Sequence, residues 1–323
     1  MTTSTTTTSR FGGIAGTYMG LAGALVLMLA LFGSLSHYFL TLNTFVTIAN
    51  DIPALTVMAV GMTFVLIIAG IDLSVGSVMA LSSGLCSLAI LQWHWSLPLA
   101  LLLGLATGTA CGLATGIVSV KWKLPAFIVS LGMLEVARGG AYLVTDSRTQ
   151  YIGDMIGWLN SSLIGGISPA FIIAFLIIVI GHVALTRCVF GRYMIGIGTN
   201  EEAMRLAGVD PRPVKIAVYA LLGLLSSIAG LFQTARLEAA DPNTGIGIEL
   251  QVIAAVVIGG TSLMGGRGSV ISTFFGVLII SVLEAGMAQI GASEPTKRII
   301  TGLVIIAAVM LDKYRDTRKQ RRH

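Results

Sequence analysis

One carboxylate in this sequence has no charged neighbour for a long way in either direction. Asp72 is the only charged residue between Asp51 and Lys121, and it lies in the segment GIDLS, residues 70–74. A charged side chain at the centre of a bilayer costs at least roughly 2.5–3.5 kcal/mol on insertion scales. A carboxylate in so apolar a stretch therefore needs hydrogen-bond donors, a cation or water around it.

Three roles for Asp72 are open on the sequence alone. Its carboxylate could cap a helix that begins near Leu73 or Ser74, by accepting backbone N–H groups, and we favour this structural role. Asp72 and Ser74 could instead lie in a broken helix that lines a polar translocation path, where the glycine frees backbone groups. Asp72 could also pair with a cation, for which the candidates are Arg138 and Arg267.

Four further ionisable groups lie within apolar stretches. Glu135 and Arg138 are three residues apart, so a helix places them on one face, and we expect them to pair with each other. Glu284 has no obvious partner nearby in the sequence. We expect His182 to be an interfacial or hydrogen-bonded histidine, since a proton relay needs a chain of such groups and the sequence offers isolated ones.

The sequence holds none of the short motifs that carry catalysis or nucleotide binding. The segment GGRGS, residues 265–269, lacks both the spacing and the lysine of a G-x-x-x-x-G-K-[ST] phosphate loop. The three cysteines and four histidines are scattered and match no disulfide or zinc pattern. We therefore expect no catalytic residue, no metal site and no cofactor on this chain.

The elements that position these residues are hydrophobic helices. Of the 323 residues, 55% are hydrophobic and 11% are charged, whereas a soluble domain carries about 25% charged residues. Because a helix needs roughly 20 apolar residues to cross a bilayer, we predict an all-α polytopic membrane protein. We expect about ten spans, at 18–40, 45–70, 74–92, 97–120, 125–145, 168–187, 214–235, 250–264, 270–290 and 297–311.

The distribution of positive charge predicts the orientation of these spans. With a cytoplasmic N-terminus, fifteen of the 20 Lys and Arg fall in inside segments, as the positive-inside rule requires. Both termini are then cytoplasmic. We expect a disordered N-terminus at 1–17, a transmembrane domain at 18–311 and a basic tail at 312–323, and the net charge of +5 needs no nucleic-acid partner.

The longest inside segment, 187–215, has the signals of a short exposed helix. Asn200 is a candidate N-cap, and Glu201 and Glu202 would lie in the first turn, where the helix dipole favours acidic residues. Gly208 can end the helix, and prolines follow it. Such a helix is either an ordinary loop element or a docking site for a soluble partner.

This loop and several other segments resemble the ribose-type monosaccharide permeases of ABC importers. Glu202, Ala203 and Gly208 match the E-A-x-x-x-x-G pattern of the coupling loop in those permeases, although Met204 replaces an alanine. The matching segments occur in the family's order and are AVGMTFVLIIAGIDLSVGS (59–77), PAFIVSLGML (125–134), GRYMIGIGTNEEAMRLAGV (191–209), AGLFQTARL (229–237) and VIAAVVIGGTSLMGGRGS (252–269).

The resemblance implies a fold, a location and a set of partners. It implies the ABC importer permease fold in the inner membrane of a bacterium, with a second permease copy, identical or not, enclosing one path. A separate cytoplasmic ATPase subunit, which would hold ATP and Mg, would grip the loop through Asn200, Glu201, Glu202, Ala203, Arg205 and Gly208. A periplasmic sugar-binding protein would dock on the other side.

The sugar itself is less well specified by the sequence. The resemblance implies ribose or a related pentose, or another sugar, an inositol-like polyol or a furanose signal. Phe127 and Ser130 combine an aromatic ring with a small polar group, so with Asp72 and Ser74 they are candidates for the translocation path. A carrier driven by an ion gradient is the alternative from another class.

Overall fold

The structure is a computed structural model that describes residues 9–320, and the side chains of 18–163, 165–307 and 310 within that range. Its α-helices are α1 (Ser9–Leu35), α2 (Leu42–Asp51), α3 (Pro53–Ile67), α4 (Val75–Leu91), α5 (Leu97–Lys121), α6 (Ala126–Val144), α7 (Pro169–Arg187), α8 (Val189–Thr199), α9 (Glu201–Leu206), α10 (Pro211–Leu237), α11 (Ile248–Ile258), α12 (Val270–Gln289) and α13 (Glu294–Gln320). Two 3₁₀ turns, η1 (Gly153–Leu159) and η2 (Ile164–Gly166), and two short strands, β1 (Gln150–Tyr151) and β2 (Ala239–Ala240), connect them.

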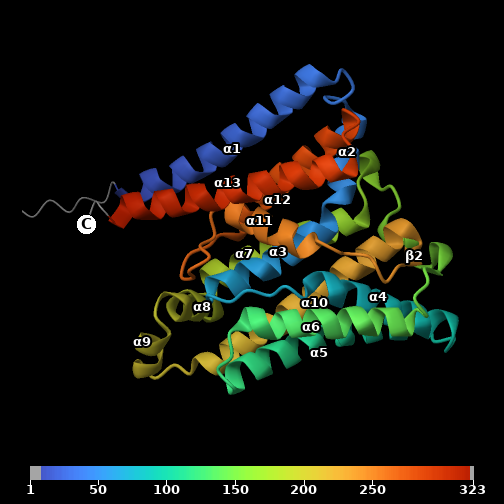
Figure 1. Ribbon diagram of the computed structural model, residues 1–323, viewed down its shortest axis with the longest axis horizontal. Helices are drawn as coiled ribbons and strands as arrows, with labels where there is room; N and C mark the ends of the chain where they lie inside the picture. The colour runs from blue at the N-terminus through green and yellow to red at the C-terminus, as the bar shows by residue number, and fades with distance from the viewer. Residues whose placement is uncertain (1–8, 321–323) are drawn as a thin grey trace, which may run out of the picture.

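The long helices lie side by side in one bundle, which confirms the all-α prediction (Figure 1). Six of them are long and apolar enough to cross a membrane: α1 from Tyr18 onward, α5, α6, α7, α10 and α12. The pair α2 and α3 passes the same test together but bends by 49°. Helices α4 and α11 are apolar but shorter, and every one of the ten expected spans contains a helix or, for 45–70, this bent pair.

The ends of several elements differ from the sequence prediction. The span expected at 45–70 is broken by a bend at Ile52. The bend occurs there because the next residue, Pro53, has no N–H with which to continue the preceding helix. Helix α1 already begins at Ser9, inside the segment 1–17 that we expected to be disordered, and residues 1–8 lie outside the described chain. The helix α13 extends through most of the expected tail at 312–323, of which the last three residues are also outside the described part.

The two ends of the bundle carry different elements. Helices α8 and α9 lie at one end, together with the start of α1 and the end of α13 (Figure 1). The strands pair antiparallel, with Gln150 opposite Ala240, at the other end, where α10 finishes and α11 follows (Figure 1). Each strand has only two residues, so the pairing ties two loops together.

Helix α10 is the central packing element and contacts α3, α4 and α5. Glycines let α5 and α10 approach backbone to backbone: a Cβ on Gly108 would overlap the carbonyl oxygen of Gly223, and one on Gly112 would overlap that of Tyr219. Small residues at such crossings are the usual means by which membrane helices gain packing energy. The close contact with α5 holds α10 in place, and α10 runs between the two ends of the bundle, where the polar groups lie.

Candidate functional site

The short helix expected after Asn200 is present as α9. The Asn200 side chain accepts a hydrogen bond from the N–H of Ala203 at 2.9 Å, which is the N-cap geometry predicted from the sequence. Gly208 has a φ of +84° directly after the helix, and the N–H of Val209 donates back to the carbonyl of Met204. A left-handed glycine at this place ends a helix without strain.

The charged side chains of α9 lie at the surface and form weak ion pairs within the chain. Glu202 and Arg205 pair at 2.9 Å with both side chains about 60% exposed. Glu201 pairs at 3.0 Å with Lys215, on the first turns of α10. Exposed pairs of this kind contribute about 0–1 kcal/mol, so a partner that offers better geometry can replace them. Leu206 at the end of α9 is 81% exposed, an apolar side chain set beside these charges.

A cavity of about 860 Å³ separates α9 from the body of the bundle. We call it the α9 cavity. Four of the six residues predicted to couple to an ATPase line it: Glu201, Glu202, Arg205 and Gly208. Its other walls come from the segment between α3 and α4, from the connection between α5 and α6, and from the start of α10. The space leaves room for α9 to move toward the bundle.

The end of α8 connects α9 to two breaks in the helices of the bundle. A Cβ on Gly198 would overlap the carbonyl oxygen of Ile67, the last residue of α3, and would lie 2.5 Å from the N–H nitrogen of Gly266, between α11 and α12. Gly266 itself donates to the carbonyl of Ile67 at 2.8 Å. Three chain segments therefore meet in backbone contact at Gly198, three residues before α9 begins. We did not predict this contact, and its only signal is the glycine pair Gly196 and Gly198.

Asp72 lies in the break between α3 and α4 and is 2% exposed. Its Oδ1 accepts hydrogen bonds from the N–H of Ser74 at 2.8 Å and from the Ser74 hydroxyl at 2.6 Å. Helix α4 begins at Val75 with Ser74 as its N-cap, and the Ser74 side chain makes no capping bond. Asp72 thus closes an Asx-type turn before the helix, rather than capping the first N–H groups of α4 itself.

The four residues predicted to line the path lie close together, but only three of their side chains are buried, and the Phe127 carbonyl accepts the Ser130 hydroxyl at 3.1 Å. Ser130, on α6, is fully buried and accepts the N–H of Leu73 at 3.1 Å, which joins α6 to the Asp72 turn. Phe127 is 45% exposed on the outside of α6. Neither of the two cavities described here includes Asp72, Ser74, Phe127 or Ser130 in its lining.

The prediction that Glu135 pairs with Arg138 is wrong. The Arg138 guanidinium donates instead to the carbonyl oxygens of Pro242 and Thr244, so it pairs neither with Glu135 nor with Asp72. Glu135 is left exposed on α6. The loop after β2 is thus held against α6, and Tyr142 adds a hydrogen bond of 2.7 Å to the Asn243 amide oxygen. Carbonyl groups more than 100 residues away satisfy the guanidinium, which sequence spacing does not reveal.

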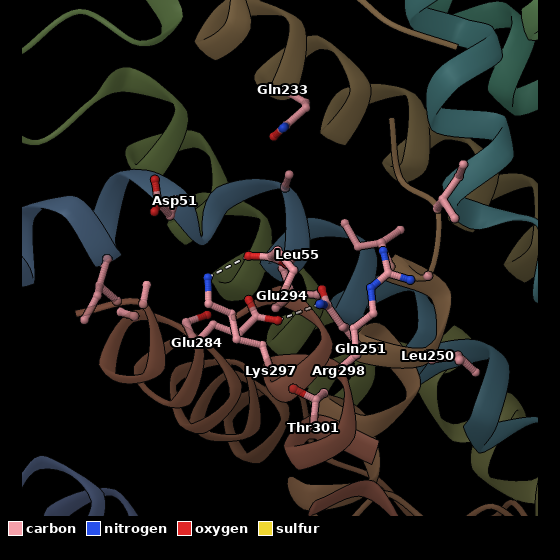
Figure 2. Close-up of a pocket in the computed structure, with 18 of the residues that line it drawn as sticks. Asp51, Leu55, Gln233, Leu250, Gln251, Glu284, Glu294, Lys297, Arg298 and Thr301 are labelled. Atoms are coloured by element: carbon pink, nitrogen blue, oxygen red, sulfur yellow. Dashed lines mark hydrogen bonds and ion pairs between the residues drawn. The ribbon is translucent and has the colours of Figure 1, made fainter. Parts of the chain in front are cut away.

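Glu284 has a partner that the sequence did not show. Its carboxylate accepts a hydrogen bond of 2.5 Å from the Gln251 amide on α11 (Figure 2). The two side chains line a cavity of about 650 Å³ at the strand end of the bundle, which we call the Gln251 cavity. An ion pair of 2.9 Å between Arg236 and Asp51 lies at the same cavity, and both side chains are about 40% exposed.

The described residues hold no group of three or more His, Cys, Asp or Glu that could bind a metal ion. Cys86, Cys111 and Cys188 are free thiols. His182, which we expected to be interfacial or hydrogen-bonded, has a buried Nδ1 without a hydrogen-bond partner in the part of the chain that the structure describes.

Residues 44–309 match the family described as "Branched-chain amino acid transport system / permease component". The chain is 37% identical over 294 residues to the ribose import permease protein RbsC of Escherichia coli K12, covering 90% of this chain and 91% of the relative. The RbsC of Bacillus subtilis is 39% identical over 264 residues, which are 79% of this chain and 80% of that protein.

A relative with a different sugar in its name matches almost as well. The fructose import permease protein FrcC of Rhizobium meliloti is 32% identical over 302 residues, covering 90% of this chain and 83% of FrcC. No solved structure matches significantly.

Proposed function

The chain belongs to the family of branched-chain amino acid transport system permease components, and from that premise we propose that it is the membrane-spanning subunit of an ATP-driven importer for ribose or a related monosaccharide. The observation that carries the proposal is the identity of 36–39% to ribose import permeases over most of the chain. The chain makes no chemical bond, and ATP hydrolysis belongs to a separate ATPase subunit.

The proposed grip of that ATPase subunit is α9. Asn200 caps this helix by accepting a hydrogen bond from the N–H of Ala203, and Gly208 ends it. The charges on its surface come from Glu201, Glu202 and Arg205. ATP and Mg bind to the partner, whose movement displaces α9 into the α9 cavity. Gly198 then transmits the displacement to the two helix breaks, because its backbone touches both of them.

The proposed orientation places α9 and both termini in the bacterial cytoplasm. The basic residues gather at this end, as the positive-inside rule expects. A second permease copy completes the path, and a periplasmic sugar-binding protein docks at the strand end. The acidic residues of the loops there, such as Asp146, Asp154 and Asp241, suit a docking surface.

Uptake by the complete transporter tests this proposal. The permease is reconstituted into liposomes with its ATPase and binding protein, and ATP-dependent uptake of D-ribose is compared with that of D-fructose and L-arabinose. We expect a pentose, D-ribose or L-arabinose, to accumulate and D-fructose to compete poorly. Uptake of branched-chain amino acids without uptake of any of these sugars would refute the proposal.

A further inference from the structure

The Gln251 cavity is lined by more polar side chains than a packed membrane bundle needs. Its walls are the ends of six helices that finish or begin at the strand end: α2, α3, α10, α11, α12 and α13. A lining that carries ion pairs is incompatible with lipid tails, so this space suits a polar occupant. Helix α11 starts at Ile248, after glycines with φ of +79° and +87°, and its 11 residues are too few to cross the bilayer.

The charged groups of the lining balance one another. Three acids, Asp51, Glu284 and Glu294, face three bases, Arg236, Lys297 and Arg298. Asp51 pairs with Arg236, and Glu294 pairs with Lys297 at 2.7 Å (Figure 2). Because the formal charges cancel, the cavity has no excess of either sign with which to select an anion or a cation.

Neutral polar groups supply the unused hydrogen-bonding capacity. Gln233 on α10, Ser281 on α12 and Thr301 on α13 line the cavity, and the side chains of these three residues make no hydrogen bond within the described chain. Figure 2 shows the Gln233 amide pointing from α10 toward the side where Gln251 and Glu284 meet. The Gln251 amide oxygen and the second Glu284 oxygen add acceptors beside their shared bond.

We propose that the Gln251 cavity is a weak binding site, within a single chain, for a neutral polyhydroxylated molecule. Donors and acceptors from α10, α11, α12 and α13 surround a space of about 650 Å³, which is within the range of small-molecule sites and leaves room for bridging water around a pentose. No aromatic ring is in its lining, so hydrogen bonds hold the ligand. This inference rests on the proposed function. It identifies the Gln251 cavity as the place where each chain first binds the sugar.

Saturation-transfer NMR of D-ribose with the permease–ATPase complex in nanodiscs, without binding protein, tests the site. Gln233→Leu and Ser281→Ala remove polar ends that bond nothing in the described part of the chain, so neither leaves a described buried group unsatisfied. We expect each to weaken D-ribose binding by about 2- to 10-fold, the value of one neutral hydrogen bond. Gln289→Leu, at the end of α12 and outside the cavity lining, is the matched control and keeps wild-type binding.

Unchanged binding in the Gln233→Leu, Ser281→Ala double variant would overturn the inference, and so would the absence of any saturable signal with the wild-type complex. A separate uptake assay with the binding protein distinguishes the two proposals. If that assay shows ATP-dependent D-ribose uptake while the NMR experiment fails, this site is wrong and the importer stands. Binding of a phosphatidylglycerol headgroup analogue in place of D-ribose would also overturn the inference, since it would assign the cavity to lipid.

Discussion

The two cavities lie at opposite ends of one bundle and differ in how their polar groups are used. In the α9 cavity the acids Glu201 and Glu202 are bonded to cations of the same chain, on an exposed six-residue helix. In the Gln251 cavity the neutral groups Gln233 and Ser281 have no partner in the described chain. Exchangeable surface pairs suit a protein partner, whereas fixed, unpartnered polar groups inside a cavity suit a small ligand.

The two ends also differ in the kind of contact that holds their elements together. At the α9 end, the break after α3 and the break after α11 touch each other through Gly266 and Ile67, and α8 touches both. At the strand end, the contacts are side-chain hydrogen bonds around water-accessible space. In the proposed mechanism, a displacement of α9 reaches the two helix breaks through these backbone contacts.

Reversing the α9 charges gives the largest expected effect. In the Glu201→Lys, Glu202→Lys double variant, like charges would face the residues of the ATPase that normally receive the acids. Such contacts cost several kcal/mol, so co-purification of the ATPase should fall by about a hundredfold or more while membrane insertion stays normal. Asp154→Lys, an exposed reversal at the strand end, is the control. Normal ATPase yield with the double variant would remove α9 as the docking element.

Adding one methyl group at Gly198 should leave ATPase binding to α9 intact but block the transfer of α9 movement to the helix breaks. The new Cβ in Gly198→Ala overlaps the Ile67 carbonyl, and overpacking of this kind costs about 1–3 kcal/mol. We expect a lower melting temperature and little transport, although α9 still binds the ATPase. Gly132→Ala on α6 meets no atom within 4 Å and should behave as the wild type. Wild-type transport by Gly198→Ala would show that movement of α9 does not reach the breaks after α3 and α11 through α8.

Asp72→Asn should have a smaller effect. The asparagine carbonyl still accepts both Ser74 bonds, so we expect a loss of about 1 kcal/mol or less in unfolding free energy and near-normal transport. Asp72→Ala leaves the Ser74 N–H without its acceptor and should be worse. A normally assembled Asp72→Asn complex with no transport would mean that the negative charge itself acts in the path.

The ion pair at the mouth of the Gln251 cavity should contribute least. Asp51 and Arg236 are about 40% exposed, and exposed pairs are worth about 0–1 kcal/mol. A double-mutant cycle with Asp51→Asn and Arg236→Gln, measured by thermal unfolding, should give a coupling energy in that range. A coupling of several kcal/mol would show that this pair clamps α2 to α10 and that the strand end is more rigid than the α9 end.

The sequence predicted the parts of this molecule that depend on local chemistry. Hydrophobic length located a helix, or the bent pair α2 and α3, within each of the ten expected spans, and the cap at Asn200 with the glycine at 208 located α9. It failed where a partner comes from far along the chain: Gln251 for Glu284, and the Pro242 and Thr244 carbonyls for Arg138. Periodicity reports which face a side chain occupies, whereas helix packing decides what it meets there.

The central claim is that this chain is a passive conduit, moved by a partner that binds α9. The direct measurement is D-ribose accumulation in liposomes containing the permease, with and without the ATPase and binding protein, under ATP and under an imposed ion gradient. We predict uphill accumulation only with all three components and ATP, unaffected by an ionophore. Uphill accumulation by the purified chain alone, driven by the gradient and abolished by the ionophore, would contradict the account.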